Sequence, residues 1–144
     1  MIRISSATEI FEVLKRFNDC FPLSIDSRVG NLGSYAIKLA EHAFVYVTQD
    51  NGEITGVVVF YANDSSTKVA YLSQIAVSVL HQNKGIGSLL LQFSCDLSKE
   101  YGMTKMKLEV DNSNSKAISH YEKHKFTIIG QASLDSQYMM KELT

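Results

Sequence analysis

The pair Asn51–Gly52 separates two runs of residues that favour β-strands, residues 43–49 and 53–62. Both residues of a two-residue hairpin turn need positive φ angles, which asparagine and glycine adopt more readily than other residues. The pair therefore predicts a β-hairpin, and a third β-rich run at residues 68–77 extends it to an antiparallel meander. A chain with this meander is expected to fold around a sheet.

The rest of the chain alternates between helical and extended patterns. Apolar residues recur at helical spacing in four segments, which we predict to be helices: residues 6–17, 32–41, 85–101 and 115–124. Extended patterns predict four further strands, at residues 1–4, 105–110, 126–131 and 136–143. The resulting order predicts one α/β (α+β) domain over residues 1–144, in which helices cover both faces of a mixed, mainly antiparallel sheet of about seven strands.

Composition excludes several classes of protein. The formal net charge of −1 argues against a general nucleic-acid binder, which needs a basic surface. No apolar run approaches the roughly 18 residues of a membrane span, and the first residues lack the apolar core of a signal peptide. The two cysteines are too few for a disulfide framework, and no Cys/His spacing indicates a metal site. We therefore expect a soluble cytoplasmic protein without metal, nucleic-acid or membrane partners.

A loop with two glycines leads into a strongly apolar helical segment. It comprises Gln82, Asn83, Lys84, Gly85, Ile86, Gly87 and Ser88. Free amides at the start of a helix bind anions, the helix dipole adds to the attraction, and glycine lets a phosphate approach without a Cβ in the way. The other interpretation is that the glycines only shape a turn, and the loop by itself favours that simpler interpretation.

A second group of polar residues lies between residues 108 and 126. Asn114 and Tyr121 are seven positions apart in a predicted helix, so they point the same way about two turns apart. They are either a capping asparagine and a core tyrosine or two functional residues. Glu109 lies on the strand face opposite the apolar residues, where it is either a solvated carboxylate or a general base.

The order of these segments resembles the GNAT superfamily of N-acetyltransferases. The acetyl-CoA signature of that family, Q/R-x-x-G-x-G/A, fits residues 82–87. The second family segment is matched by Asn114, Ala117, Tyr121 and Phe126. The motifs are most similar to the branch of ribosomal-protein alanine N-acetyltransferases, in which IAV also precedes the loop and LEV precedes the asparagine. The close resemblance covers residues 70–128.

The resemblance implies a fold, a reaction and a site. The fold is that of the acyl-CoA acyltransferases, and the reaction moves an acetyl group from acetyl-CoA to a primary amine by direct attack in a ternary complex. Glu109 would act as the base and Tyr121 as the acid. The pyrophosphate would rest on residues 83–88, and Asn114 would hold the pantetheine arm. That arm would also pair with the strand residues Ile75, Ala76 and Val77.

Several features leave the function open. Family members often have a proline where Val79 stands, an aromatic residue where His81 stands and a glycine where Lys125 stands. A non-catalytic acyl-CoA-binding or regulatory domain, or a domain whose loop binds another nucleotide, would share the glycine loop. The acceptor is open among a peptide N-terminus, a lysine, an amino sugar and a small amine, as is the choice between monomer and homodimer. The irregular segment at residues 20–31 is a candidate border of the substrate site.

Overall fold

The computed structural model describes residues 1–20 and 29–144. The strands are β1 (Ile2–Arg3), β2 (Phe44–Asp50), β3 (Glu53–Tyr61), β4 (Val69–Val77), β5 (Lys105–Asp111), β6 (Thr127–Gln131) and β7 (Ser136–Glu142). The helices are α1 (Ala7–Arg16), α3 (Leu32–His42), α4 (Ile86–Glu100) and α5 (Ser115–Lys123), with the short 3₁₀ turns η1 (Asn18–Cys20) and η2 (Val79–His81). These strands and α-helices follow the predicted order and lie close to the predicted positions. Most of the candidate substrate border at residues 20–31 lies outside the described residues.

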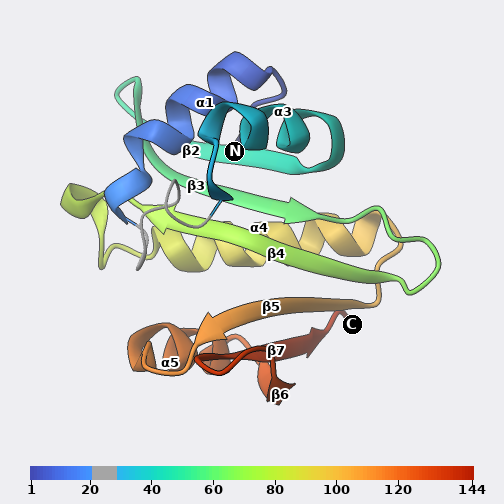
Figure 1. Ribbon diagram of the computed structural model, residues 1–144. Coiled ribbons are helices and arrows are strands. Elements are labelled where there is room, and N and C mark those ends of the chain that lie inside the picture. The colour runs from blue at the N-terminus through green and yellow to red at the C-terminus, as the bar shows by residue number, and fades with distance from the viewer. Residues whose placement is uncertain (21–28) are drawn as a thin grey trace. The chain divides into compact units, whose positions relative to one another are not determined.

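The described strands form one seven-stranded sheet in the order β1-β2-β3-β4-β5-β7-β6 (Figure 1). β4 runs parallel to β5, whereas the pairs β1–β2, β2–β3, β5–β7 and β6–β7 are antiparallel. A parallel pair needs a long crossover connection, and the segment with α4 supplies it. The predicted α/β (α+β) class with a mixed, mainly antiparallel sheet is therefore confirmed.

Contacts divide the chain into two compact units. The N-terminal unit comprises Met1–Phe60 and Gln74–Phe93, and the C-terminal unit comprises Tyr61–Ser73 and Ser94–Thr144. β3, β4 and α4 each contribute residues to both units, because the boundaries fall inside these elements. The expectation of one domain over residues 1–144 stays a prediction.

The N-terminal unit is organised around the β2–β3 hairpin. Asn51 and Gly52 have φ angles of 51° and 79°, so both turn residues are left-handed, as predicted for a two-residue turn. Helices α1 and α3 lie side by side (Figure 1) and contain the buried residues Ile10, Leu14 and Leu39. Burial of these apolar stripes stabilises two helices whose isolated segments are too short to be stable in water.

Both faces of β3 are buried from residue 55 to residue 60. Helix α4 covers one face, since Gly56 lies against Leu90 and the Phe93 ring packs on Tyr46 with ring centroids 4.6 Å apart. Helices α1 and α3 lie over the opposite face (Figure 1). This double burial explains why the run in β3 is almost continuously apolar rather than alternating.

The C-terminal unit contains β5, β6, β7 and the start of β4. The side chains of Met106, Leu108 and Met139 are at most 1% exposed and share one face of the sheet. Residues alternate between the two faces of a strand, so the intervening residues of β5 lie on the other face. That face carries Lys107, which is partly exposed, and Glu109, which is exposed.

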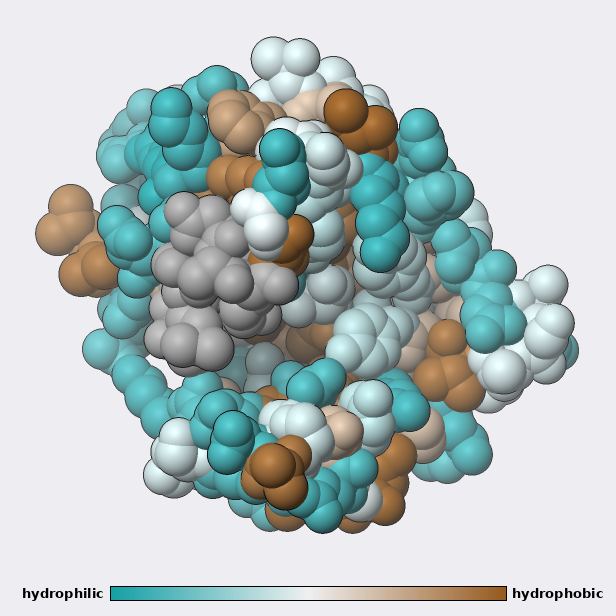
Figure 2. Space-filling model, viewed as in Figure 1, coloured by the Kyte–Doolittle hydropathy of each residue, from teal (hydrophilic) through white to brown (hydrophobic). Residues whose placement is uncertain are grey.

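The surface is mixed in polarity. On the face shown in Figure 2, exposed apolar residues are scattered among hydrophilic ones. Leu80 and Leu134 are the most exposed large apolar residues in the described part of the chain, at 81% and 90%. Among helices of the described residues, none is both long enough and apolar enough to cross a membrane.

Replacing Gly56 by alanine is predicted to destabilise the fold. A Cβ here would lie 2.9 Å from Leu90 Cδ1, 3.0 Å from Thr48 Oγ1 and 3.1 Å from Ile86 Cγ2, so its neighbours would have to move. We expect Gly56→Ala to lower the free energy of unfolding by about 1–3 kcal/mol, the usual cost of overpacking. Denaturant unfolding measures this change, and Gly33→Ala in α3 is the matched control because a Cβ there meets one side-chain atom at 3.3 Å. An unchanged unfolding midpoint for Gly56→Ala would contradict the close packing of α4 on β3.

Candidate functional site

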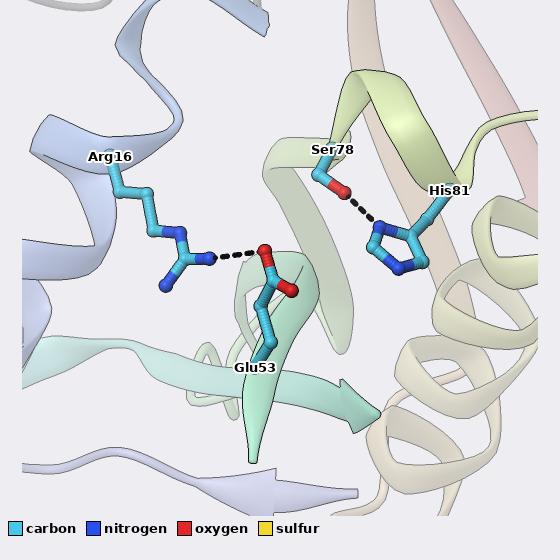
Figure 3. A network of polar contacts seen from close by, with 4 residues as sticks. All are labelled: Arg16, Glu53, Ser78 and His81. Carbon is cyan, nitrogen blue, oxygen red and sulfur yellow. Dashed lines mark hydrogen bonds and ion pairs between the residues drawn. The ribbon is translucent and has the colours of Figure 1, made fainter. Parts of the chain in front are cut away.

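Hydrogen bonds hold the loop between β4 and α4. The Ser78 N–H donates to the Thr55 carbonyl at 2.9 Å, and the Ser78 hydroxyl lies 2.6 Å from Nδ1 of His81 (Figure 3). The Gln82 side chain donates from Nε2 to the Val77 carbonyl at 3.1 Å. The first residue of the predicted signature thus turns back to the end of β4.

The loop backbone enters the left-handed region twice. Asn83 has a φ angle of 64° and Gly85 one of 84°, whereas the intervening Lys84 has no positive φ. The Gly85 carbonyl accepts from the Leu89 N–H at 3.0 Å, so α4 begins directly after this glycine. Among the described atoms, none lies within 4 Å of a Cβ built on Gly85. The left-handed backbone, rather than crowding, therefore requires glycine, and space remains beside the helix start.

The remaining loop residues belong to the helix start itself. Ile86, Gly87 and Ser88 form the first turn of α4, which is 15 residues long. The first turn of a helix concentrates the positive end of its dipole, and alternating backbone conformations before it form an anion-binding nest. Lys84 is exposed next to this turn and carries the only charge within the predicted signature. The segment has the physical properties of an anion site.

The predicted strand residues lie at the end of β4. β4 pairs with β5 from residue 69, which lies opposite residue 105, to residue 72, which lies opposite residue 108. In the described structure the pairing stops there. Ile75 and Val77 are partly exposed, whereas Ala76 is buried at 6% exposure. Backbone groups on these three residues therefore lie outside the ladder with β5.

Asn114 caps helix α5. Its Oδ1 accepts from the Ala117 N–H at 3.2 Å, which satisfies one of the free amides at the helix start. The interpretation of Asn114 as a capping residue is therefore what the structure shows. Because the cap uses only the carbonyl oxygen, the Nδ2 amide is the group that remains to donate to a ligand.

Tyr121 lies near the end of α5 and packs against Phe126, with ring centroids 5.8 Å apart. Between them, Lys125 has a φ angle of 73°, so it adopts the left-handed backbone conformation that glycine adopts most readily. The Phe126 N–H then donates to the Tyr121 carbonyl at 3.0 Å. Although part of the tyrosine side chain reaches solvent, burial raises the pKa of Tyr121 to about 12. The hydroxyl is thus a neutral donor at physiological pH.

A chain of hydrogen bonds ends on the carboxylate of Glu109. Ser136 Oγ donates to Glu109 Oε2 at 2.6 Å and lies 2.7 Å from Ser133 Oγ. An ionised carboxylate only accepts, so the Ser136 proton points to Glu109 and Ser133 donates to Ser136. The Asp135 N–H in turn donates to Ser133 Oγ at 3.2 Å. The Glu109 carboxylate is therefore anchored at one oxygen, while the residue itself is exposed.

The predicted residues fall into two groups. The strand residues 75–77 and the loop residues 82–88 lie in the N-terminal unit, whereas Glu109, Asn114 and Tyr121 lie in the C-terminal unit. Within the described residues, Glu109 and Tyr121 form no hydrogen bond with each other. In the same part of the chain, no group of three or more His, Cys, Asp or Glu side chains is arranged to hold a metal ion.

No pattern in the sequence identifies Ser133 and Ser136 as part of the site. Their link to Glu109 depends on the register of β7, which places Ser136 opposite Asp111 and Tyr138 opposite Glu109. Register between strands far apart in the sequence is not encoded in any local pattern. Serines next to a turn are also common, so this segment carried no distinguishing signal.

A family model matches well over half of the chain. The model is that of the acetyltransferase (GNAT) family, and it aligns with residues 10–126. That span includes the whole glycine loop and the three predicted residues of the C-terminal unit, Glu109, Asn114 and Tyr121.

Two curated proteins are similar to parts of the chain. Streptothricin acetyltransferase from Streptomyces lavendulae is 36% identical over 59 residues, which cover 41% of this chain and 31% of that protein. N-alpha-acetyltransferase 30 from Schizosaccharomyces pombe is 29% identical over 82 residues, which cover 56% of this chain and 55% of that protein. The matches thus span about a third of the first relative and about half of the second.

A solved structure is similar over nearly the whole chain. The ribosomal-protein-S18-alanine N-acetyltransferase from Escherichia coli superposes with a TM-score of 0.75 at 22% identity, and the match covers 99% of this chain and 94% of that one. At this level of identity the likeness concerns the fold. The same branch was the one indicated by the sequence motifs.

Burial of Tyr121 predicts that its side chain ionises at a higher pH than that of an ordinary tyrosine. Its phenolate should form near pH 12, well above the pKa of 10.0 of an ordinary tyrosine. The difference in tyrosinate absorbance between wild type and Tyr121→Phe isolates this group from the other tyrosines. Since the unfolded chain ionises first, the contribution of Tyr121 to stability is fully present below pH 10 and is lost as the pH rises towards 12. A midpoint near pH 10 in this difference titration would contradict the raised pKa of Tyr121.

Proposed function

Because the chain belongs to the acetyltransferase (GNAT) family, we propose that it is an N-acetyltransferase that moves the acetyl group of acetyl-CoA to a primary amine. Membership places it among acyltransferase enzymes, and acetyl-CoA is the acetyl donor of the family. The observation that carries the proposal is the Glu109 carboxylate, which the Ser136 hydroxyl anchors at one oxygen while the residue stays exposed. A domain that only binds acyl-CoA needs no such anchored base.

Glu109 is the proposed base. An alkyl amine has a pKa of about 10.4, so at neutral pH it is mostly an unreactive ammonium ion. Glu109, directly or through one water molecule, accepts the proton that the amine loses as it attacks the thioester in a ternary complex. The hydrogen bond from Ser136 to Oε2 orients the carboxylate.

Tyr121 is the proposed donor to the leaving sulfur. Its pKa of about 12 compares with about 8.5 for a thiol, so complete proton transfer would be uphill by about 5 kcal/mol. Tyr121 therefore donates a hydrogen bond while the carbon–sulfur bond breaks, rather than transferring its proton. The cost of full transfer is larger than that expected for an ordinary tyrosine, because burial raises the pKa.

The glycine loop and β4 are the proposed donor-binding elements. The left-handed backbone at Gly85 and the space beside it fit a pyrophosphate on the first turn of α4, with Lys84 adding charge. The backbone of residues 75–77 would pair with the pantetheine arm and offer an N–H to the thioester oxygen. Asn114 would donate from Nδ2 to the same arm, since its Oδ1 caps α5.

The acceptor is a primary amine, and the comparisons do not identify which class of amine it is. One relative is named for streptothricin, and the structural neighbour for an alanine of ribosomal protein S18. The alternative to catalysis is a non-catalytic acyl-CoA-binding or regulatory domain. That domain would bind acetyl-CoA yet release no thiol with any amine.

The proposed function is tested by thiol release from acetyl-CoA with a panel of dipeptides, amino sugars and small amines. We expect turnover with at least one acceptor, and we expect Tyr121→Phe to lower kcat about tenfold, the value of one hydrogen bond of about 1.4 kcal/mol. Calorimetry should show acetyl-CoA affinity within about twofold of wild type, because the lost bond forms as the sulfur leaves. Binding of acetyl-CoA without turnover would favour the non-catalytic domain, and wild-type turnover by Tyr121→Phe would remove Tyr121 from the mechanism.

The serine chain predicts a distinct effect on the base. Ser136→Ala removes the donor to Glu109 and should lower kcat about tenfold with little change in KM. Ser136→Thr keeps the hydroxyl and should restore most of the activity.

The matched control for Ser136→Ala is Ser113→Ala. Ser113 Oγ donates to Asp111 at 2.6 Å on the same strand, so this variant removes an equivalent bond from a different carboxylate. We expect Ser113→Ala to leave kcat unchanged. Equal losses of kcat in the two variants would show that the effect is not specific to Glu109.

A further inference from the structure

The sheet face around Glu109 carries a cation that pairs with no carboxylate of the described residues. Lys107 lies two positions before Glu109 on β5, so the two side chains share a face. Its Nζ lies 4.0 Å from the centroid of the Tyr138 ring. By contrast Lys105, the next residue of this face, has its Nζ 3.7 Å from a carboxylate oxygen of Glu142. The Lys107 ammonium group instead lies over the aromatic ring of Tyr138.

The Tyr138 ring connects this cation to the proposed base. Tyr138 is the direct register partner of Glu109 across the β5–β7 ladder, and Lys107 reaches the same ring from the diagonal position. Cross-strand partners lie about 5 Å apart, so the three side chains form one contiguous patch. On the other side of Tyr138 the register partner is Gly130 of β6, which has no side chain. The Tyr138 ring is partly exposed and lies between the positive charge of Lys107 and the negative charge of Glu109.

We propose that Lys107 and Tyr138 form an acceptor subsite, which selects amines that carry an anionic group near the reacting nitrogen. This inference rests on the proposed function, with Glu109 as the base. Residues two apart on a strand are about 7 Å apart, which sets the span between the bound amine and its anionic group. The anionic group is a carboxylate or a phosphate, since both accept charged hydrogen bonds from an ammonium ion.

The charges of Glu109 and Lys107 explain why the acceptor needs both an amine and an anionic group. Glu109 attracts the ammonium form of any amine, but Lys107 on the same patch repels an acceptor with positive charge alone. An anionic group placed on Lys107 turns that repulsion into attraction. Lys107 and Tyr138 thus favour zwitterionic acceptors over amines of similar size that lack the anion. Since the patch is partly exposed, added salt should weaken the preference.

The test compares kcat/KM for acceptor pairs in which only one member carries the anionic group. Alanine against alanine amide tests a carboxylate, and glucosamine 6-phosphate against glucosamine tests a phosphate. We expect wild type to prefer the anionic member of at least one pair by about tenfold, mainly through KM. Lys107→Met keeps the length of the side chain and should bring that ratio close to one. Lys105→Met is the matched control, because it removes a lysine already paired with Glu142, and it should retain the ratio.

The outcomes separate this inference from the proposed function. The pair that shows the preference identifies the anionic group as a carboxylate or a phosphate, and either supports the subsite. Efficient transfer to the members that lack the anionic group, with no preference in either pair, would overturn the subsite and leave the acetyltransferase intact. An equal ratio in Lys107→Met and wild type would also overturn it. Binding of acetyl-CoA with no transfer to any amine would overturn the proposed function and the subsite together.

Discussion

Alternate residues of β5 are buried, and this burial determines how the functional residues of the C-terminal unit are presented. Met106 and Leu108 are at most 1% exposed, and a shift of one residue in register would place both in solvent. Because the apolar face is fixed, Lys107 and Glu109 must lie on the other face. The same constraint acts on β7, where the buried Met139 pairs with Leu108. The polar patch is therefore positioned by the core beneath it.

The two proposed catalytic groups differ in the way the fold surrounds them. Glu109 is exposed on its strand face, and the Ser136 hydroxyl donates a hydrogen bond to one of its oxygens. Tyr121 is packed against Phe126, and burial raises its pKa to about 12. Because their surroundings differ, Glu109 can accept a proton at the same pH at which Tyr121 donates a hydrogen bond. A reaction that removes a proton from an amine and stabilises a departing sulfur needs both.

Much of the fold follows from local patterns, whereas part of the site does not. The Asn51–Gly52 pair and the helical periodicities place the strands and α-helices to within about a residue of their ends, because turn chemistry and burial act over short stretches. The glycine loop was predicted from motif spacing, and its left-handed backbone at Gly85 agrees with that motif. The contact between Ser136 and Glu109 was not predictable, since it depends on the register of strands 27 residues apart. The capping role of Asn114 was one of two interpretations that spacing alone left open.

Two glycines next to α4 illustrate why a residue type has to be interpreted through its surroundings. At Gly56 a Cβ would meet three neighbours within 3.1 Å, so glycine is required by packing and that space is already filled. At Gly85 no described atom lies within 4 Å of a Cβ, so glycine is required by the φ angle of 84° and the space stays accessible. Only the second kind of glycine can admit a ligand to the backbone amides. The geometry therefore separates a structural glycine on β3 from a candidate binding glycine at the start of the helix, although the sequence alone presents both simply as glycines.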